Sequence, residues 1–243
     1  MGKSCQFYAD IMAMQNEVTG SCNLVIVKFP NGETVRFVVD CGLFQEREYE
    51  ELNSVLPFNA ENVDFCLVTH VHVDHIGRLP YMVRNGFFRP IYSTETTCKL
   101  LPLALNDCFK VLSSVSKRKN STPLYSEKDV ERTLGLLKSC RYNETVQVHE
   151  NIKVTFFNNG HLLGAALILV QISYHGYEDI NLLFTGDYNN KNIFFDVNPI
   201  PPRILELRLT VVQEATYGYM NSSEITKCFR NNIIKCLNND GTV

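Results

Sequence analysis

The chain has 243 residues, of which 45% are hydrophobic, and its 23 basic and 26 acidic side chains leave a formal net charge of −3. This balance excludes a surface that is basic overall, so any site for a polyanion has to be a local patch or a metal centre. The length and the apolar content suffice for a sizeable core in one domain, or in one domain with a small appendage.

Cysteine usage and the N-terminus indicate the compartment. None of the nine cysteines belongs to a C-x-x-C pair, and several lie in apolar, strand-like runs, which is typical of buried reduced thiols rather than of a disulfide framework. The opening residues "MGKSCQFYAD" contain no charged segment followed by a long apolar one, and no apolar run reaches membrane-spanning length. The sequence therefore predicts a soluble, cytoplasmic protein with no membrane partner.

The first third of the chain has the pattern of a β-hairpin followed by a buried strand. Two β-rich runs flank the "PNG" turn at 30–32 in "CNLVIVKFPNGETVRFVVDCG", and Asp40 follows the second run. The segment "VDFCLVT" (63–69) is apolar almost throughout, which is typical of a central strand buried on both faces. A turn dense in histidines comes next, and residues 76–84 are expected to form a helix that ends near the "NG" at 85–86.

Helix and strand patterns then alternate to the end of the chain. "RPIYS" (89–93) predicts a strand, Thr94 is the expected N-cap of a helix over 95–112, and a basic loop, "SSVSKRKNSTP", leads to a second helix, "SEKDVERTLGLLKSC". The next strand-like runs are "ETVQVHE", "IKVTFFN", "AALILVQISYH", "INLLFTGD" and "RLTVVQEATYG". A helix that begins at Ser222 or Ser223 is expected at the end. Interleaved strands and helices, with β-rich blocks in both halves, predict an α/β fold with two packed sheets between outer helices, an αββα sandwich.

The segment "THVHVDHIG" (69–77) places three of the six histidines and one aspartate within six positions. Imidazoles two positions apart point the same way on a tight turn, so His70 and His72 converge on one point, while Asp74 and His75 face a second. So many polar groups at the end of a buried strand are costly unless they bind something. Histidine and carboxylate donors without cysteine suit Zn²⁺ or a similar ion, and they argue against a purely structural site.

Four ligands shared between two ions give each ion too few ligands. The chain offers two further donors at strand ends. His161 and Asp187 each follow a glycine, in "NNGHLLG" and "FTGDYNN", where the backbone can turn sharply. We expect six ligands for two Zn²⁺ ions, with Mn²⁺ as a substitute: His70, His72 and His161 on one ion, Asp74 and His75 on the other, and Asp187 between them.

Asp40 has two interpretations, a solvated carboxylate at a strand end or a partner that orients a ligand histidine. His149 and His175 are not expected to bind metal, because a lone histidine at a strand end is more often a surface residue than a ligand.

Together these motifs resemble the sequential motifs of the metallo-β-lactamase fold. The H-x-H-x-D-H run (70–75), "DCGLFQ" with Asp40, "NGHLLGA" with His161 and "FTGDYN" with Asp187 occur in its order and at suitable spacing. The last ligand position of the turn is histidine, which resembles the hydrolases of this fold, whereas true β-lactamases usually carry arginine there. The cysteine ligand of many lactamases has no counterpart in this chain.

Three further segments resemble the β-CASP branch, whose members process RNA: "EVTGSCNLV" (17–25), "PLYSEKDVERTL" (123–134) and "VVQEATYG" (211–218). The last is similar to the branch's "ESTYG" element and places Glu214 at its first signature acid. The resemblance implies a metallo-β-lactamase domain over 1–210 and the beginning of a β-CASP cap over 211–243. It also implies that the chain ends within the cap and lacks the segment that returns to complete the second sheet.

The resemblance implies hydrolysis of RNA phosphodiester bonds by a dinuclear zinc-activated hydroxide. Asp74 is the expected general base, and Asp40 and Glu214 complete the expected catalytic set, with Glu214 beside a histidine that this chain does not contain. RNA is the expected partner, in a homodimer or a processing complex. Candidates for contacts with the RNA backbone are Lys110, Lys117, Arg118 and Lys119, although a charge run is usually a solvated loop.

Two other functions stay open at this point. One is an inactive module that binds metal and holds RNA or a partner subunit. The other is a hydrolase of thioesters or lactones with the same fold, which the "EATYG" and "PLYSEKDV" segments disfavour.

Overall fold

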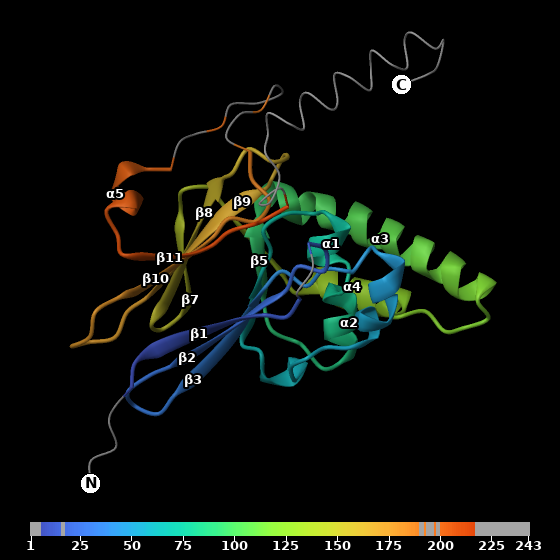
Figure 1. Ribbon diagram of the computed structural model, residues 1–243, viewed down its shortest axis with the longest axis horizontal. Helices are drawn as coiled ribbons and strands as arrows, with labels where there is room; N and C mark the ends of the chain where they lie inside the picture. The colour runs from blue at the N-terminus through green and yellow to red at the C-terminus, as the bar shows by residue number, and fades with distance from the viewer. Residues whose placement is uncertain (1–5, 16–17, 190–191, 193–196, 198–199, 217–243) are drawn as a thin grey trace.

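Two β-sheets stacked face to face form the centre of the molecule, and helices lie on their outer faces (Figure 1). The structure, a computed structural model, describes residues 6–15, 18–189, 192, 197 and 200–216. The arrangement confirms the predicted αββα sandwich. In the part of the chain so described, no helix is long and apolar enough to cross a membrane.

The first sheet has six strands in chain order. They are β1 (Tyr8–Ala13), β2 (Asn23–Lys28), β3 (Thr34–Val39), β4 (Phe65–Leu67), β5 (Ile91–Thr94) and β6 (Leu137–Cys140). Strands β1 to β3 are antiparallel neighbours, whereas β3 to β6 run parallel. The predicted hairpin is β2–β3, and the predicted central strand is β4, which is buried throughout.

The second sheet has the strand order β11-β10-β9-β8-β7. Its strands are β7 (Thr145–His149), β8 (Ile152–Asn158), β9 (Ala166–Ile172), β10 (Ile180–Phe184) and β11 (Leu209–Val212). All neighbours are antiparallel except β10 and β11. Strand β11 crosses the expected boundary between residues 210 and 211, and the division into two domains stays a prediction. The expected C-terminal helix lies outside the described residues.

The helices form the outer layers of the sandwich. Those on the first sheet are α1 (Val73–Ile76), α2 (Leu79–Arg84), α3 (Glu95–Arg118) and α4 (Glu127–Gly135), with 3-10 helices at Arg47–Ser54 and Ala60–Asn62. The short helix α5 (Pro202–Leu205) packs Ile204 on the outer face of the second sheet. With 24 residues, α3 is the longest helix of the described residues, and Figure 1 shows it running away from the sheets.

Side-chain alternation along the strands explains the two cores that flank the second sheet. In β9, Ile168 and Val170 pack between the sheets, whereas Leu167 and Leu169 pack on the outer face near Ile204. Successive side chains of a strand point to opposite faces. A strand covered on both sides is therefore apolar on both faces, which is why β9 lacks polar alternation over most of its length.

Two predicted helices on either side of β5 have different bounds in the structure. The expected helix over 76–84 is two helices, because the amide of Arg78 bonds to the carbonyl of Cys41 instead of continuing the helical pattern. The expected end of the next helix near residue 112 is also wrong, since α3 continues to Arg118. The serines at 113, 114 and 116 do not stop a helix, which instead ends before Asn120 with its φ of 50°.

Other segments were misassigned or missed. The helix expected from Ser126 ends at Gly135, and Leu137–Cys140 form β6 because they pair with β5. Neither β1 nor α5 was predicted. β1 is a half-exposed edge strand, and such a strand depends on its neighbour more than on its own composition.

Helix α4 begins with a capping interaction that we expect to contribute measurably to stability. The buried carboxylate of Asp129 accepts the amide and the hydroxyl of Ser126, at 2.8 and 2.6 Å. Asp129→Ala is expected to lower the free energy of unfolding by about 1–2 kcal/mol, because it leaves the amide and the hydroxyl of the N-cap residue Ser126 without their acceptor. Urea unfolding measures this, with exposed Glu131→Ala of the same helix as the control. Equal stability of the two variants would contradict it.

Candidate metal centre

Loops from both sheets bring the predicted site residues to one edge of the sandwich. In the first sheet Asp40 follows β3 and the histidine turn follows β4, and in the second sheet His161 follows β8. Asp187 and Glu214 follow the parallel neighbours β10 and β11. Residues that lie far apart in the sequence therefore meet in one place.

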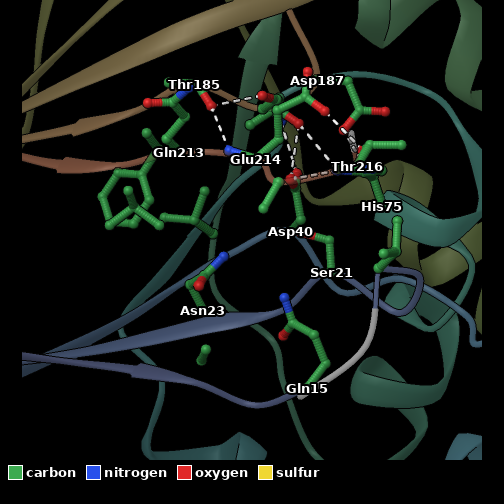
Figure 2. A pocket seen from close by; sticks show the side chains of 18 residues that line it. Gln15, Ser21, Asn23, Asp40, His75, Thr185, Asp187, Gln213, Glu214 and Thr216 are labelled. Carbon is green, nitrogen blue, oxygen red and sulfur yellow. Dashed lines mark hydrogen bonds and ion pairs between the residues drawn. The ribbon is translucent and has the colours of Figure 1, made fainter. Parts of the chain in front are cut away.

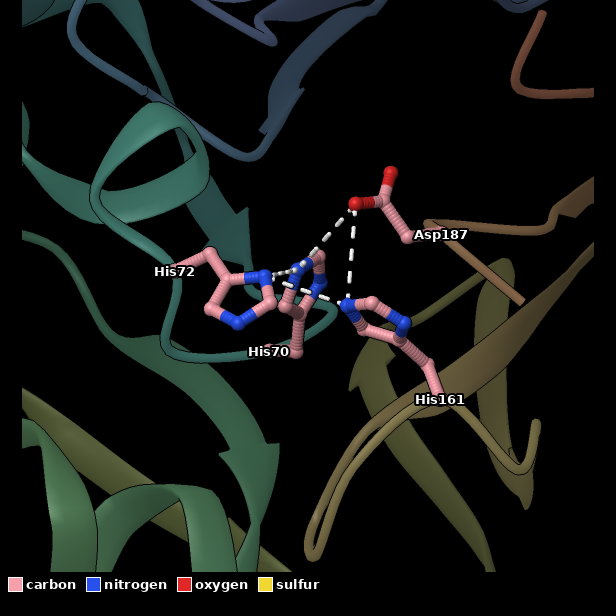
Figure 3. A group of neighbouring side chains, drawn as sticks. All are labelled: His70, His72, His161 and Asp187. Atoms are coloured by element: carbon pink, nitrogen blue, oxygen red, sulfur yellow. Dashed lines mark hydrogen bonds and ion pairs between the residues drawn. The ribbon is translucent and has the colours of Figure 1, made fainter. Parts of the chain in front are cut away.

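Three histidines and one aspartate form a compact group of ligand-type atoms: His70, His72, His161 and Asp187 (Figure 3). These atoms all lie within 4.8 Å of one another. Nδ1 of His72 is 3.1 Å from Nε2 of both His70 and His161, and Oδ2 of Asp187 is 3.7 Å from the same two Nε2 atoms. The ligands expected for the first ion thus converge with the expected bridging carboxylate.

The spacing of the group fits a tetrahedral metal ion. Metal–nitrogen bonds of about 2.05 Å place neighbouring ligand atoms of a tetrahedron about 3.3 Å apart, between the observed 3.1 and 3.7 Å. Three imidazoles and one carboxylate are donors that zinc and similar ions accept. The residues present therefore fit a divalent metal ion.

Thr69 sets the orientation and the tautomer of His70. Its Oγ1 donates its single hydrogen to Oδ2 of Asp40 at 2.7 Å and lies 3.0 Å from Nδ1 of His70. Oγ1 therefore accepts from Nδ1–H, which leaves the lone pair of Nε2 directed at the group. Burial lowers the pKa of His70 and, to a smaller extent, that of His161, so both are in the neutral form that binds metal.

The other oxygen of Asp187 faces the expected ligands of the second ion. Its Oδ1 lies 3.3 Å from Nε2 of His75, and Oδ2 of Asp74 lies 4.0 Å from the same nitrogen. Burial by itself lowers the pKa of His75, but the carboxylates of Asp40 and Asp187 outweigh it and raise the pKa to about 10. A metal ion at Nε2 would have to displace that proton. Asp74 and His75 thus lie beside the compact group rather than inside it.

Asp40 is buried, and its carboxylate is fully engaged. It accepts the amide of Thr69 at 2.8 Å, the hydroxyl of Thr69 at 2.7 Å and Nδ1–H of His75 at 2.8 Å. Its φ of 61° is in the left-handed region, which aspartate tolerates better than most residues. Of its two interpretations, the geometry matches the partner that orients a histidine, not the solvated carboxylate.

Two residues that hold the site together were not singled out in the sequence, Thr69 and Asn159. The side-chain amide of Asn159 donates to the carbonyls of Thr185 and Asp187, at 3.0 and 2.7 Å, and its oxygen accepts the amide of His161 at 3.1 Å. Asn159 thereby joins the two ligand loops of the second sheet. The asparagine pair in "FNNGH" was an available signal, because asparagine side chains commonly bond to the backbone of turns.

Glu214 lies beside a cavity of about 350 Å³ that adjoins the site and is also lined by Asp40, His75 and Asp187 (Figure 2). Its carboxylate accepts the amide of Tyr188 at 2.9 Å and the hydroxyl of Thr216 at 2.7 Å. Glu214 therefore fastens the loop that carries Asp187. Among the described residues, no hydrogen bond joins Glu214 to a histidine.

The four basic candidates for RNA contacts are all on or just after α3 and are exposed: Lys110, Lys117, Arg118 and Lys119. The beginning of α3 is fastened to the His161 loop, since the hydroxyls of Thr94 and Thr97 donate to the carbonyl of Gly164. The far end of this 24-residue helix is about 35 Å away. Lys119 is also paired with Glu50 at 2.5 Å. The structure therefore does not bring these cations to the metal group.

The two-sheet sandwich and the group of histidines and aspartate at its edge define a protein of the metallo-β-lactamase fold. Comparison with known families agrees with this assignment. Residues 26–193 match the family model of the metallo-beta-lactamase superfamily domain, so the chain belongs to this superfamily.

Among its relatives are three RNA-processing proteins. Ribonuclease TTHA0252 of Thermus thermophilus is 33% identical, and the match covers 83% of this chain and 42% of the relative. Endoribonuclease ysh1 of Aspergillus fumigatus is 32% identical over 84% of this chain and 22% of its own length. Cleavage and polyadenylation specificity factor subunit 3 of Dictyostelium discoideum is 33% identical over 84% and 25%. These relatives confirm the resemblance to the β-CASP RNA-processing nucleases, and the chain spans less than half the length of each.

Proposed function

We propose that the chain cleaves RNA phosphodiester bonds at a site for two divalent metal ions, with zinc as the expected metal. The observation that carries this proposal is the shared carboxylate of Asp187. One of its oxygens lies with the three histidines, and the other faces His75. The names of the relatives, ribonuclease and endoribonuclease, support RNA as the substrate class.

The proposed ligands are those expected from the sequence. His70, His72 and His161 would hold the first ion, Asp74 and His75 the second, and Asp187 both. When bound, such a pair of ions lowers the pKa of a water molecule and neutralises charge on a phosphoryl group. The chain itself has a net charge of −3, so its affinity for a phosphodiester would depend on this local positive charge.

We assign different tasks to the three carboxylates beside the histidines. The side chain of Asp74 is 19% exposed and accepts no hydrogen bond from the described residues. Besides its place among the ligands of the second ion, it can therefore take a proton from the attacking water as general base. Asp40 positions the ring of His75 through Nδ1. Glu214 positions the loop of Asp187 through the amide of Tyr188. The last two act on ligands rather than on the substrate.

The name of the Dictyostelium relative, a factor subunit, supports a place for this chain in an RNA-processing complex. A homodimer and a cytoplasmic location stay predictions from the sequence.

The proposed reaction is tested by offering the chain two substrates, a 5′-labelled RNA oligomer and an acyl thioester. With added Zn²⁺ we expect RNA cleavage that EDTA abolishes and that readded Zn²⁺ or Mn²⁺ restores. Hydrolysis of the thioester alone would overturn the RNA assignment. Two bound ions without turnover of either substrate would contradict catalysis by this chain and favour the metal-binding scaffold.

A further inference from the structure

Arg78, three residues beyond the second-ion ligand His75, is among the most deeply buried side chains of the molecule, with 1% of its surface exposed. No carboxylate among the described residues lies within ion-pair distance of it. A buried guanidinium is always charged and is costly to remove from water. We therefore expect the hydrogen bonds of such a group to fix backbone segments that neutral side chains would not hold in place.

The guanidinium of Arg78 gathers three separate segments by donating to their carbonyls. Nε bonds to Gly42, Nη2 to Gly20 at 3.4 Å, and Nη1 to Leu52 and Val55 at 3.3 and 3.1 Å. The ring of Phe44 covers the charge at 5.0 Å. The planar fork of arginine suits several acceptors in fixed directions, whereas lysine offers a single point of attachment.

Two of these segments, 20–21 and 41–43, hold the backbone that carries Asp74 and His75. Three of their amides donate to the three carbonyls of residues 73–75: Ser21 N to Asp74 O at 2.8 Å, Cys41 N to His75 O at 2.8 Å and Leu43 N to Val73 O at 3.0 Å. Arg78 adds its own amide, which donates to the carbonyl of Cys41 at 2.8 Å. The side chain of Arg78 therefore fixes the segments to which the second-ion ligands are anchored.

Gly42 shows how close this packing is. A Cβ atom at position 42 would lie 1.6 Å from the carbonyl oxygen of Asp74 and 2.6 Å from the amide of His75. The segment bound by Arg78 is thus in direct contact with the backbone of both ligands, so a shift of one is transmitted to the other.

Two of the three ligands of the first ion, His70 and His161, are anchored differently, whereas the carbonyl of His72 accepts the amide of His75 at 2.9 Å. His70 is oriented by Thr69, and His161 is held by Asn159. Neither Thr69 nor Asn159 has a hydrogen bond to Arg78 in the described part of the chain. A disturbance at Arg78 therefore reaches the second-ion ligands before it reaches His70 and His161.

The geometry points to Arg78 as a positioning residue for the second metal ion, acting through the backbone of residues 20–21 and 41–43. This inference rests on the proposed two-ion site. It predicts that Arg78→Lys, which retains the charge but loses the planar set of donors, changes the affinity for one ion and not for the other. We expect the first ion to bind as in the unchanged chain and the second to bind about 10–100-fold more weakly, as when an outer partner of a metal ligand is lost.

The experiment is calorimetric titration of the metal-free full chain with Zn²⁺, carried out for the unchanged chain, Arg78→Lys and Arg78→Gln. Arg84→Lys is the matched control, because Arg84 also donates to backbone carbonyls, those of Pro123 and Leu124, and ends the helix α2 that Arg78 precedes. We expect the control to bind two ions like the unchanged chain. Far-UV circular dichroism and thermal unfolding in EDTA report on the fold of each variant.

The outcomes separate this inference from the proposed function. Fewer than two ions on the unchanged chain would contradict the two-ion site itself. Two ions bound normally by both Arg78 variants, or an equal loss of affinity for both ions, would overturn the positioning role while leaving the two-ion site intact. If neither variant folds in EDTA, Arg78 is a determinant of folding, and the assignment is overturned as well.

Discussion

Replacing His72 by alanine is expected to remove the first metal ion and to reduce RNA cleavage more than about 100-fold. His72 supplies the central donor, whose Nδ1 is 3.1 Å from a nitrogen of both His70 and His161. Loss of an outer partner of a metal ligand already costs about 10–100-fold, so loss of a ligand should exceed that range. Metal content per chain and the rate of cleavage of a labelled RNA measure the effect.

The fold should survive this substitution. The side chain of His72 is exposed, and its described contacts are to cluster histidines, so in EDTA we expect a change in unfolding free energy within about 0.5 kcal/mol. His175→Ala, at an exposed histidine in the turn after β9, is the control and should retain metal and activity. Unchanged metal content in His72→Ala would show that the ligand set is wrong.

Asp40→Asn is expected to weaken binding of the second ion about 10–100-fold. The carboxylate of Asp40 receives three donors, two from Thr69 and one from His75. An asparagine whose NH₂ group replaces Oδ2 faces Nδ1–H of His75 and the hydroxyl of Thr69, and in the other orientation it faces the amide of Thr69. Either orientation breaks the network of hydrogen bonds that fixes the ring of His75. Asparagine also tolerates the left-handed φ of 61° at this position, so the effect comes from hydrogen bonding and charge rather than from backbone strain.

The same substitution should lower the free energy of unfolding by about 1–3 kcal/mol, because buried donors lose their acceptor. Asp64→Asn is the matched control, since its carboxylate also accepts a backbone amide, that of Arg36 at 2.8 Å. Asp64 precedes β4, whereas Asp40 follows its parallel neighbour β3, so the two aspartates lie at opposite ends of this strand pair. Metal titration and urea unfolding of the two variants make the comparison. If Asp40→Asn binds two ions as tightly as Asp64→Asn does, Asp40 does not orient His75.

The candidate ligands could be predicted from the sequence because ligand density is a local property, and the structure brings four of the six, His70, His72, His161 and Asp187, into one group. Four ligand-type side chains within six positions are visible without a fold, and His161 and Asp187 each follow a glycine at a strand end. The connections among them could not be predicted. The hydrogen bonds of Thr69, Asn159 and Arg78 join segments that are distant in the sequence. The periodicity of a sequence does not indicate which acceptor a buried side chain will bind.

The errors in the fold have a similar cause. β6 has no strand pattern of its own and exists because residues 137–140 pair with β5, whereas the hairpin β2–β3 has a local turn signal and was predicted. The serine-rich end of α3 was interpreted as a loop from its composition, although serine on an exposed helix face costs only a fraction of 1 kcal/mol. That error also placed Lys117 and Arg118 in a loop, when they belong to the far end of a long helix.

The central claim is that six donors from both sheets hold two divalent ions that share Asp187. Anomalous diffraction at the zinc absorption edge, from crystals of zinc-loaded protein, tests it most directly. Two peaks should appear, one among His70, His72 and His161 and one between Asp74 and His75, each in contact with a different oxygen of Asp187. An absence of zinc at these residues, or one peak with Asp187 bound on one side only, would contradict it.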